Sequence, residues 1–422
     1  MRKNHYILPF IFIAFWALTC SPKFESKFAS MNDVQVLITK DQIPQRRTTC
    51  DTNEYYAPDA AHFNHRPWYY VRVNFHFLNS TDGKNNIPAE EQYAYIENLV
   101  WILNKSLEDN MKMWLPSGND APALPIPFRY VLTGDRDIPG DKGVYNHVDD
   151  ELYFFVKKGR HRNNTDMRVI KKYAVNADSV LNIFMMPHHP DSVLSKTYRA
   201  DASGIALGSA LKVSGQWTKK PDAWGVRGIF HHEIGHVLGL SHTWNTNDGC
   251  DDTPRHPNCF NKSDQPPCDT MYSNNVMDYN AHQAAWSPCQ LGKITRNFCR
   301  INSRQRKLLN HNWCTRRDDK MITITEQIDW YSARDLQGDL VIADGGELTI
   351  HCRTSIPGNG KIVIEPGGTL KLKSARLHNS CGDKWAGVEI QSLGKKVGKL
   401  IFLEPSEIED TTQAFGSIED QR

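Results

Sequence analysis

Hydrophobic and polar residues alternate along residues 71–78 (VRVNFHFL), and this period of two predicts a β-strand. Behind Pro88 and two glutamates, apolar residues recur at the spacing of one helix face, which predicts a long amphipathic helix. These residues are Ile96, Leu99, Val100, Leu103 and Leu107. Short apolar runs predict further strands at 128–132, 144–148 and 180–186. A strand, a helix and more strands in this order describe an α/β scaffold.

Beyond Cys314 the pattern changes to short strands separated by Gly-Gly turns. Residues 338–352 (GDLVIADGGELTIHC) and 360–374 (GKIVIEPGGTLKLKS) repeat this unit 22 residues apart, and a third relative begins at Gly398. Such a period predicts a solenoid, here a partial parallel β-helix, with a β-sandwich as the alternative. We therefore expect a small all-β module at 320–422. It resembles the β-helix modules of exported bacterial surface proteins, and binding a surface partner is one role for it.

Length and charge narrow the class of protein. The 422 residues are enough for two domains, and 50 basic against 48 acidic residues give a net charge of only +2. No overall charge indicates binding to nucleic acid or to membrane lipids. The basic run 157–162 (KKGRHR) is interpreted as a solvated loop.

The N-terminus predicts export. Two basic residues precede an apolar run at 6–18 that is too short to span a bilayer, so residues 1–20 are typical of a secretory signal. The run ends in ALTC, which resembles a loose bacterial lipobox in which Cys20 would be lipidated. Cleavage without lipidation is the alternative. We expect a secreted protein or a surface lipoprotein, including one of the outer membrane, with a prosegment or linker at 21–65 and no membrane contact except through this lipid.

The strongest chemical signal is HHEIGHVLGLSH at residues 231–242, which contains the pattern H-E-x-x-H-x-x-G-x-x-H. Residues four apart share one face of a helix, so His232 and His236 can bind one ion. Gly239 allows a left-handed turn that would end the helix and bring His242 back as a third ligand. Three protein ligands leave one position open on a Zn²⁺ ion, which is typical of a catalytic site.

This motif resembles that of the metzincin metallopeptidases. The segments 240–244 (LSHTW), 251–254 (DDTP) and 275–279 (NVMDY) are similar to the pappalysin or cytophagalysin branch of that group. The resemblance implies an α/β (α+β) metallopeptidase domain, here at 66–316, with a long zinc-binding helix. It also implies that Met277 forms the hydrophobic floor of the site and that Tyr279 contacts the metal or the oxyanion. Without the motif, both residues would be interpreted as core.

The motif predicts a zinc-dependent endopeptidase. Zinc lowers the pKa of a bound water from about 15.7 towards 7, and Glu233 would accept its proton as the water attacks a peptide carbonyl. Residues 204–213 are expected to form an edge strand above the cleft. An extended peptide could pair with its residues Gly204, Ile205, Ala206, Leu207 and Gly208 through backbone hydrogen bonds. The alternative is a surface adhesion protein whose metallopeptidase domain is vestigial.

Nine cysteines follow Cys20, and export makes disulfides the expected state of most of them. Because nine is odd, at least one is unpaired within the chain. In related metallopeptidases an N-terminal cysteine can occupy the open zinc position, so Cys50 is a candidate latency switch. A disulfide between Cys50 and a distant cysteine is the alternative.

A second metal is the last candidate. Asp248, Asp251, Asp252 and Thr253 offer the oxygen ligands that Ca²⁺ favours, and the family resemblance also implies calcium nearby. A solvated acidic loop is the alternative for this segment.

Overall fold

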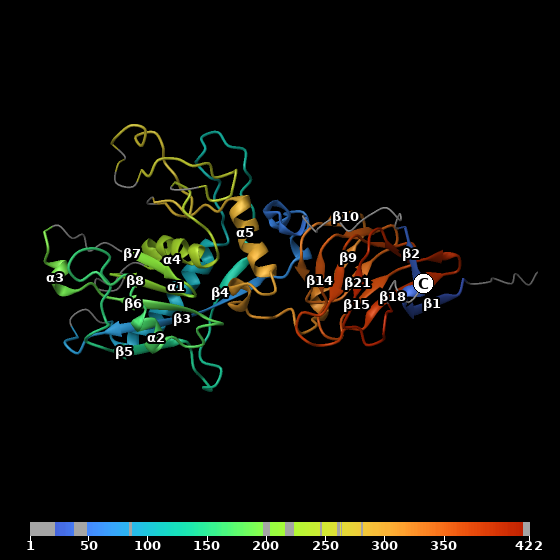
Figure 1. The fold of residues 1–422 in the computed structure, drawn as a ribbon, viewed down its shortest axis with the longest axis horizontal. Coiled ribbons are helices and arrows are strands. Elements are labelled where there is room, and N and C mark those ends of the chain that lie inside the picture. The colour runs from blue at the N-terminus through green and yellow to red at the C-terminus, as the bar shows by residue number, and fades with distance from the viewer. Residues whose placement is uncertain are drawn as a thin grey trace, which may run out of the picture.

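The chain forms an α/β body and an all-β body that lie side by side along the long axis of the molecule (Figure 1). The computed structural model describes residues 22–37, 49–83, 87–196, 203–215, 223–244, 247–259, 262, 264–279 and 282–416. The predicted signal segment with Cys20 lies outside these residues. Within them, no helix combines the length and the apolar character that crossing a bilayer requires.

The α/β body is built on one mixed sheet. Its strand order is β4-β3-β6-β8-β7, and β5 pairs with the second half of β3. The strands are β3 (Tyr69–Asn79), β4 (Phe128–Leu132), β5 (Val144–Val148), β6 (Leu181–Met186), β7 (Ser203–Leu207) and β8 (Ala210–Ser214). Every residue of the central strand β6 is buried, as expected where both faces of a sheet are covered. The strands predicted at 71–78, 128–132, 144–148 and 180–186 are thereby confirmed.

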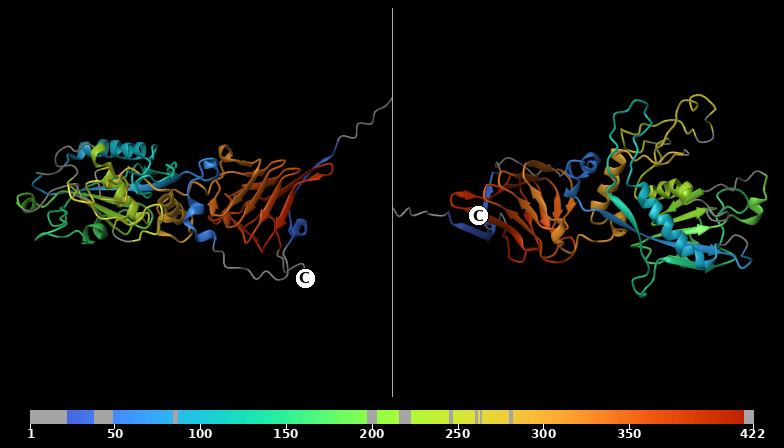
Figure 2. Two further views of the ribbon diagram at one scale, coloured as in Figure 1. Left: turned by 90° about the horizontal axis from the view of Figure 1, so that it is seen from above. Right: turned by 180° about the vertical axis from the view of Figure 1, so that it is seen from behind.

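Two helices pack against each other beside this sheet, as Figure 2 shows from above and behind. Helix α1 (Ala89–Ser106) is the predicted amphipathic helix, and its buried face carries Ile96, Leu99, Val100 and Leu103. Helix α4 (Ala223–Val237) contains the histidine motif. The remaining helices of the described residues are short or lie next to the β body. They are α2 (Arg168–Tyr173), α3 (Pro190–Val193), α5 (Pro288–Cys299) and α6 (Arg304–Lys307).

The segment predicted as one edge strand is a β-hairpin. Strand β7 ends the sheet, as predicted, but it turns at Gly208 and returns as β8, its antiparallel partner. Gly208 has a φ of +72°, a conformation that glycine adopts without a Cβ clash. The run of small and apolar residues in 204–213 gives no sign of this turn, so the sequence pattern predicts one continuous strand. The edge is therefore only five residues long.

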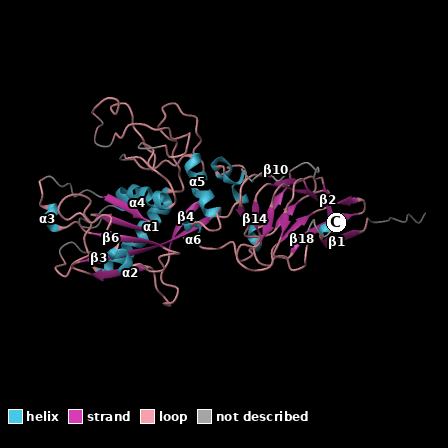
Figure 3. Cartoon of the chain, in the orientation of Figure 1, coloured by secondary structure: helices cyan, strands magenta, loops and turns pink. Residues whose placement is uncertain are grey.

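The β body consists of three sheets of short parallel strands, visible as stacked arrows in Figure 3. The strands are β9 (Ile322–Ile324), β10 (Gln327–Trp330), β11 (Arg334–Asp335), β12 (Leu340–Ile342), β13 (Glu347–Ile350), β14 (Arg353–Ser355), β15 (Lys361–Ile364), β16 (Thr369–Leu372), β17 (Arg376–His378), β18 (Gly387–Leu393), β19 (Lys396–Val397), β20 (Lys399–Phe402) and β21 (Glu407–Ile408). Parallel pairing in successive coils is the arrangement of a partial parallel β-helix and excludes the β-sandwich, whose sheets are antiparallel. The resemblance to surface-protein modules stays a prediction.

The repeat at 22 residues is real, but the segment after Gly398, predicted as a third relative of the first two units, is not their equivalent in the fold. Leu340 of β12 pairs with Ile362 of β15, which matches the offset between the first two units. The next strand in that sheet is β18, and Val388 is the partner of Ile362. The segment after Gly398 instead pairs with β16 in the second sheet. The similarity of GKLIF to GKIVI therefore reflects a shared strand pattern and not an equivalent position.

The predicted prosegment contributes strands to the β body. Strand β1 (Phe24–Phe28) pairs antiparallel with β18, and β2 (Val34–Val36) pairs parallel with β20. Between them lies the short 3-10 helix Met31–Asp33, and Met31 is buried in the core of the β body. Further 3-10 turns lie at Thr49–Asp51, Asn53–Tyr56, Phe63–His65 and Asp318–Lys320. Residues 22–37 are therefore part of the solenoid.

Buried ion pairs join the two bodies behind α5 and α6. Asp335 on β11 is fully buried and accepts hydrogen bonds from Arg306 of α6 at 2.7 Å and from Arg353 of β14 at 2.8 Å. The Arg353 guanidinium also donates to the carbonyl of Cys299, the last residue of α5. Buried charge-assisted hydrogen bonds therefore fix the end of one body against the other.

Four disulfides account for eight of the nine cysteines, and Cys299 is the buried free thiol that the odd count predicted. The pairs are Cys50–Cys352, Cys250–Cys289, Cys259–Cys268 and Cys314–Cys381. The latency-switch prediction for Cys50 is wrong in this structure. A sulfur bonded to Cys352 is no thiolate and cannot bind zinc, so Cys50 instead fastens the segment before the α/β body to the β body.

Candidate active site

Helix α4 and the turn that follows it bring the three motif histidines together. His232 and His236 lie one turn apart on α4, and Gly239 has the predicted left-handed conformation, with φ +102°. A Cβ at Gly239 would also lie 2.4 Å from the amide nitrogen of Asn297, so only glycine fits. The turn is held by Asn297 of α5, which donates to the Leu238 carbonyl. The chain then returns with His242 facing the helix.

The three Nε2 atoms converge on one point. Nε2 of His242 lies 3.1 Å from Nε2 of His232 and 3.1 Å from Nε2 of His236. Two nitrogens bound tetrahedrally to one zinc ion, each at about 2.05 Å, lie about 3.3 Å apart. The rings of His232 and His236 stand at 89° to each other, so their in-plane lone pairs meet without the rings colliding. The donor set therefore fits one tetrahedral metal ion.

The protein fixes the tautomer of two of these rings. Nδ1 of His232 lies 2.8 Å from the Val276 carbonyl oxygen, and Nδ1 of His236 lies 3.0 Å from the Leu240 carbonyl oxygen. A carbonyl can only accept, so each Nδ1 carries the proton and each Nε2 keeps its lone pair. With no cation between them, these lone pairs would repel one another at 3.1 Å. This arrangement is what a metal-binding site requires.

Burial keeps the rings in the ligating form. Together with the charge of the neighbouring His236, it lowers the pKa of His232 to about 3 and that of His242 to about 4. Burial also lowers the pKa of His236 itself. Since only the neutral imidazole binds a metal, the site is ready for an ion at neutral pH.

Met277 packs directly beneath α4. It is fully buried, and a Cβ on Gly235 would lie 2.5 Å from its sulfur, so the glycine lets the methionine approach the helix between the two ligands. The turn is stiffened by Asn275, whose side chain accepts from the Met277 backbone N–H at 2.8 Å and donates to Gln290 of α5 at 3.0 Å. The same turn supplies the Val276 carbonyl. One loop thus both supports the histidines and orients one of them.

Glu233 lies between the histidines and the edge strand. A Cβ on Gly204 would lie 2.5 Å from Cγ of Glu233, and the backbone N–H of Ala206 donates to its carboxylate. Burial raises the pKa of Glu233 to about 7, while the charge of Lys157 and the Ala206 bond act in the opposite direction. A divalent cation beside this carboxylate would favour its charged form. Glu233 therefore has the position of a proton acceptor next to the point on which the three Nε2 atoms converge.

The substitution Gly204→Ala tests this contact. Its methyl group would force the Glu233 side chain away from its position, so we expect kcat for peptide hydrolysis to fall about 10- to 100-fold. The backbone of Gly204 is an ordinary strand, so the melting temperature should change little. Steady-state kinetics beside a thermal melt check both, and an unchanged kcat would show that Glu233 need not lie there.

Tyr279 also lies beside the point on which the three Nε2 atoms converge. Its ring centroid is 4.8 Å from that of His242 and 5.6 Å from that of His232. Burial and the nearby charge of Glu233 raise the pKa of its hydroxyl, which therefore stays protonated. A protonated phenol at this place can donate a hydrogen bond to an oxyanion.

These groups line a cleft of about 510 Å³. Glu233, His236, His242 and Tyr279 form its floor, and β7 forms one wall from Gly204 to Gly208. The lining residues that the sequence analysis did not single out include two cations, Lys157 and Arg304. Lys157 belongs to the run interpreted as a solvated loop. No local pattern marks either residue, because each reaches the cleft from a distant part of the chain.

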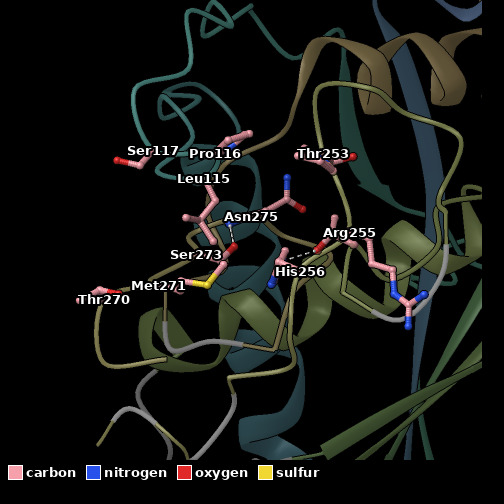
Figure 4. Close-up of a pocket in the computed structure, with 12 residues that line it drawn as sticks. Leu115, Pro116, Ser117, Thr253, Arg255, His256, Thr270, Met271, Ser273 and Asn275 are labelled. Carbon is pink, nitrogen blue, oxygen red and sulfur yellow. Dashed lines mark hydrogen bonds between the residues drawn. The ribbon is translucent and has the colours of Figure 1, made fainter. Parts of the chain in front are cut away.

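A second hollow of about 460 Å³ lies near the turn of Met277 (Figure 4). It is formed by two loops, with Leu115 and Pro116 from one and Arg255 and His256 from the other, and Asn275 at its base. None of the three motif histidines lines it. The cleft beside β7 is therefore the candidate active site.

A second group of potential ligands does not converge. His161 and His189 stack with their rings 3.7 Å apart and only 13° from parallel, beside Asp191. Lone pairs in two parallel ring planes cannot point at one ion. His161 lies 3.1 Å from a carboxylate oxygen of Asp191, which explains the cluster as a hydrogen bond with a stacked neighbour.

The calcium prediction receives no support. The carboxylate of Asp248 accepts from the hydroxyl of Thr253 at 2.7 Å and from a backbone N–H at 3.1 Å. Asp252 instead accepts from Ser287 and from the Cys289 N–H, at the start of α5. These oxygens are used to close a loop and to cap a helix, and they do not gather around one point. Asp251 is exposed.

The comparisons with known proteins agree with this site. Residues 164–298 match the peptidase M43 family model, described as pregnancy-associated plasma protein-A. This part of the chain is therefore similar to the pappalysin metallopeptidases. The match covers less than half of the chain and supports a metallopeptidase. The matched region contains the three histidines, Glu233 and the turn of Met277.

The chain is also similar to solved structures of mirolysin. Mature mirolysin of Tannerella forsythia with a cleaved peptide is 16% identical, with a TM-score of 0.39, over 57% of this chain and 94% of that one. Mirolysin in complex with compound 9 is 15% identical, with a TM-score of 0.40, over 57% of this chain and 96% of that one. No curated protein matched the chain.

Proposed function

We propose that this metallopeptidase is a zinc-dependent endopeptidase whose metal is held by His232, His236 and His242. The observation that carries the proposal is the convergence of three Nε2 atoms at 3.1 Å, with the Nδ1 protons of two rings directed at carbonyl oxygens. Zinc in this place would polarise the peptide carbonyl and make a water molecule acidic enough to attack it. A vestigial domain would not need Glu233 and Tyr279 to face the same point.

The protein groups divide the proton transfers between them. Glu233 accepts the proton of the attacking water and returns it to the nitrogen of the departing amine. Tyr279 donates a hydrogen bond from its hydroxyl to the oxygen that becomes negative. Met277 keeps the floor apolar beneath the histidines.

Strand β7 is the proposed docking edge for the substrate. Its backbone pairs with β8 on one side, and the Ala206 N–H points the other way, towards Glu233. Alternate residues of a strand turn their backbone groups to opposite sides, so Gly204 and Ala206 face the cleft. An extended peptide bound there would place its carbonyl over the histidines, and this favours cleavage within a chain.

Export is proposed from the N-terminus together with the disulfides. Four disulfides in one chain are typical of an oxidising compartment outside the cytosol. Together with the signal-like segment 1–20, they support a secreted or surface-held enzyme, with lipidation of Cys20 as the anchored form.

Metal removal tests the proposed function. The purified protein is expected to digest casein, to lose at least 95% of this activity on dialysis against a chelator, and to recover it with one equivalent of Zn²⁺. Elemental analysis should find about one zinc per chain, and His242→Ala should lose it. Full activity in the chelated protein would rule out a metallopeptidase mechanism, and no activity with zinc bound would favour the adhesion protein.

A further inference from the structure

Two cations stand at opposite ends of the edge strand. Arg304 lies at the turn after β7, where a Cβ on Gly208 would be 3.6 Å from its guanidinium. Lys157 lines the same cleft at the other end. The backbone N–H of Phe155 donates to the carbonyl of Pro187, which follows the last residue of β6, and this bond holds the Lys157 loop there. The first residue of β7 lies at the same end of the sheet, because it and the last residue of β6 both pair with the last residue of β8.

Both side chains lack a protein counter-charge. Lys157 and Arg304 are exposed, and neither forms an ion pair within the part of the chain that the structure describes. Neighbouring cations do form such pairs, Arg168 with Asp166 and Arg306 with Asp335. Among the described residues that line the cleft, Glu233 is the only one with a carboxylate. With a divalent metal bound, the cleft would be strongly positive.

The backbone around Arg304 is held firmly. Gln305 donates its side-chain amide to the Val237 carbonyl at the end of α4, and Arg306 forms the buried pair with Asp335. The hydroxyl of Ser303 caps the short helix α6 by accepting from the Arg306 N–H. Arg304 therefore projects from a backbone that is tied both to the catalytic helix and to the β body.

We propose that this cleft selects substrates with acidic side chains near the scissile bond, with Lys157 pairing on one side and Arg304 on the other. The inference rests on the proposed peptidase function and names its substrate class, anionic segments of proteins. A strand rises about 3.3 Å per residue, so each end of β7 lies within two or three residues of a bond placed over Glu233. Both cations can therefore reach side chains of a peptide paired with β7.

The test uses the zinc-loaded full chain and a peptide that it cleaves at one mapped bond. Each of the three positions on either side of that bond is varied among Glu, Gln and Lys, which changes charge with little change in size. For at least one position on each side, Glu is expected to raise kcat/KM about two- to fivefold over Gln, and Lys to lower it. The Glu advantage should shrink in 1 M NaCl, because salt screens exposed charges.

Variants assign each preference to one cation. Lys157→Gln should bring the Glu-to-Gln ratio to about one on one side only, Arg304→Gln on the other side only, and Lys157→Glu should reverse the preference towards Lys. Lys158→Gln and Lys307→Gln are matched controls outside the cleft and should leave both ratios unchanged.

The outcomes separate this inference from the proposed function. Equal cleavage rates for the Glu, Gln and Lys peptides would overturn the acidic preference but not the peptidase function. The same holds if Lys157→Gln and Arg304→Gln leave the Glu-to-Gln ratio of kcat/KM unchanged. Absence of cleavage of every peptide by the zinc-loaded protein would overturn both.

Discussion

Replacing Glu233 with glutamine is expected to lower kcat for peptide hydrolysis by about two to four orders of magnitude while zinc binding persists. The amide has the same shape as the carboxylate but cannot accept a proton from water. On the proposed function, the three histidines would hold the metal without Glu233, since the Nδ1 atoms of two of them bond to the carbonyls of Val276 and Leu240. The measurements are kcat on a quenched fluorescent peptide and zinc per chain.

A surface variant controls for the loss of one negative charge. Glu97 lies on α1, where its carboxylate accepts from Tyr93, and both side chains are exposed. Glu97→Gln makes the same chemical change far from the cleft and should leave kcat and zinc content unchanged. If Glu233→Gln kept full activity with zinc bound, another group would have to be the proton acceptor.

The scaffold of the α/β body could be predicted because each element carries its own pattern. The alternation in β3 and the apolar spacing in α1 depend only on which side of an element faces the core. Two features escaped this reasoning. The turn at Gly208 lies inside an apolar run, and β18, which continues the sheet after β15, follows an insertion that shifts the repeat. Both depend on pairing between strands, which a local period does not encode.

The candidate site was predictable to the extent that it is local in sequence. The histidines, Glu233 and Gly239 occupy one helix and its turn, so their spacing alone places them on a common point. Other groups reach the site from distant parts of the chain. They are the Val276 carbonyl, the Cα of Gly204 and the two cations of the cleft. Their roles exist only after folding, and the sequence pattern alone does not show them.

Cys50 shows why residue chemistry alone left alternatives open. A thiolate near a zinc site and half of a disulfide look the same in sequence, and the difference depends on which group lies within reach. In the fold, Cys352 lies within reach of Cys50, with a Cα–Cα distance of 5.8 Å. The same bond brings residues 302 apart in sequence together, and it belongs to the junction between the bodies.

Removing the carboxylate at that junction is expected to have the largest effect on stability. In Asp335→Ala, the guanidinium groups of Arg306 and Arg353 would stay buried without their counter-charge, which costs about 3 to 5 kcal/mol. Thermal and urea unfolding, followed by tryptophan fluorescence, measure the loss. Asp319→Ala is the matched control, because Asp319 pairs with Arg317 at the surface, where water screens the charges, and its loss should leave stability almost unchanged.

The ion pairs of Asp335 should also determine how the stability of the protein depends on pH. Burial acts to raise the pKa of Asp335, but the charges of Arg353 and Arg306 outweigh it and hold the pKa well below its usual range. A carboxylate with a lowered pKa stabilises the fold fully above its unfolded pKa of about 3.9, and that contribution is lost as the pH falls towards the folded value. Asp335→Asn should therefore flatten the acid limb of the stability curve below about pH 4. It should also lower stability at pH 7, since a neutral amide leaves two buried cations unbalanced. Equal acid sensitivity in Asp335→Asn and the unchanged protein would mean that other carboxylates control acid unfolding, and a neutral effect at pH 7 would mean that water reaches this junction.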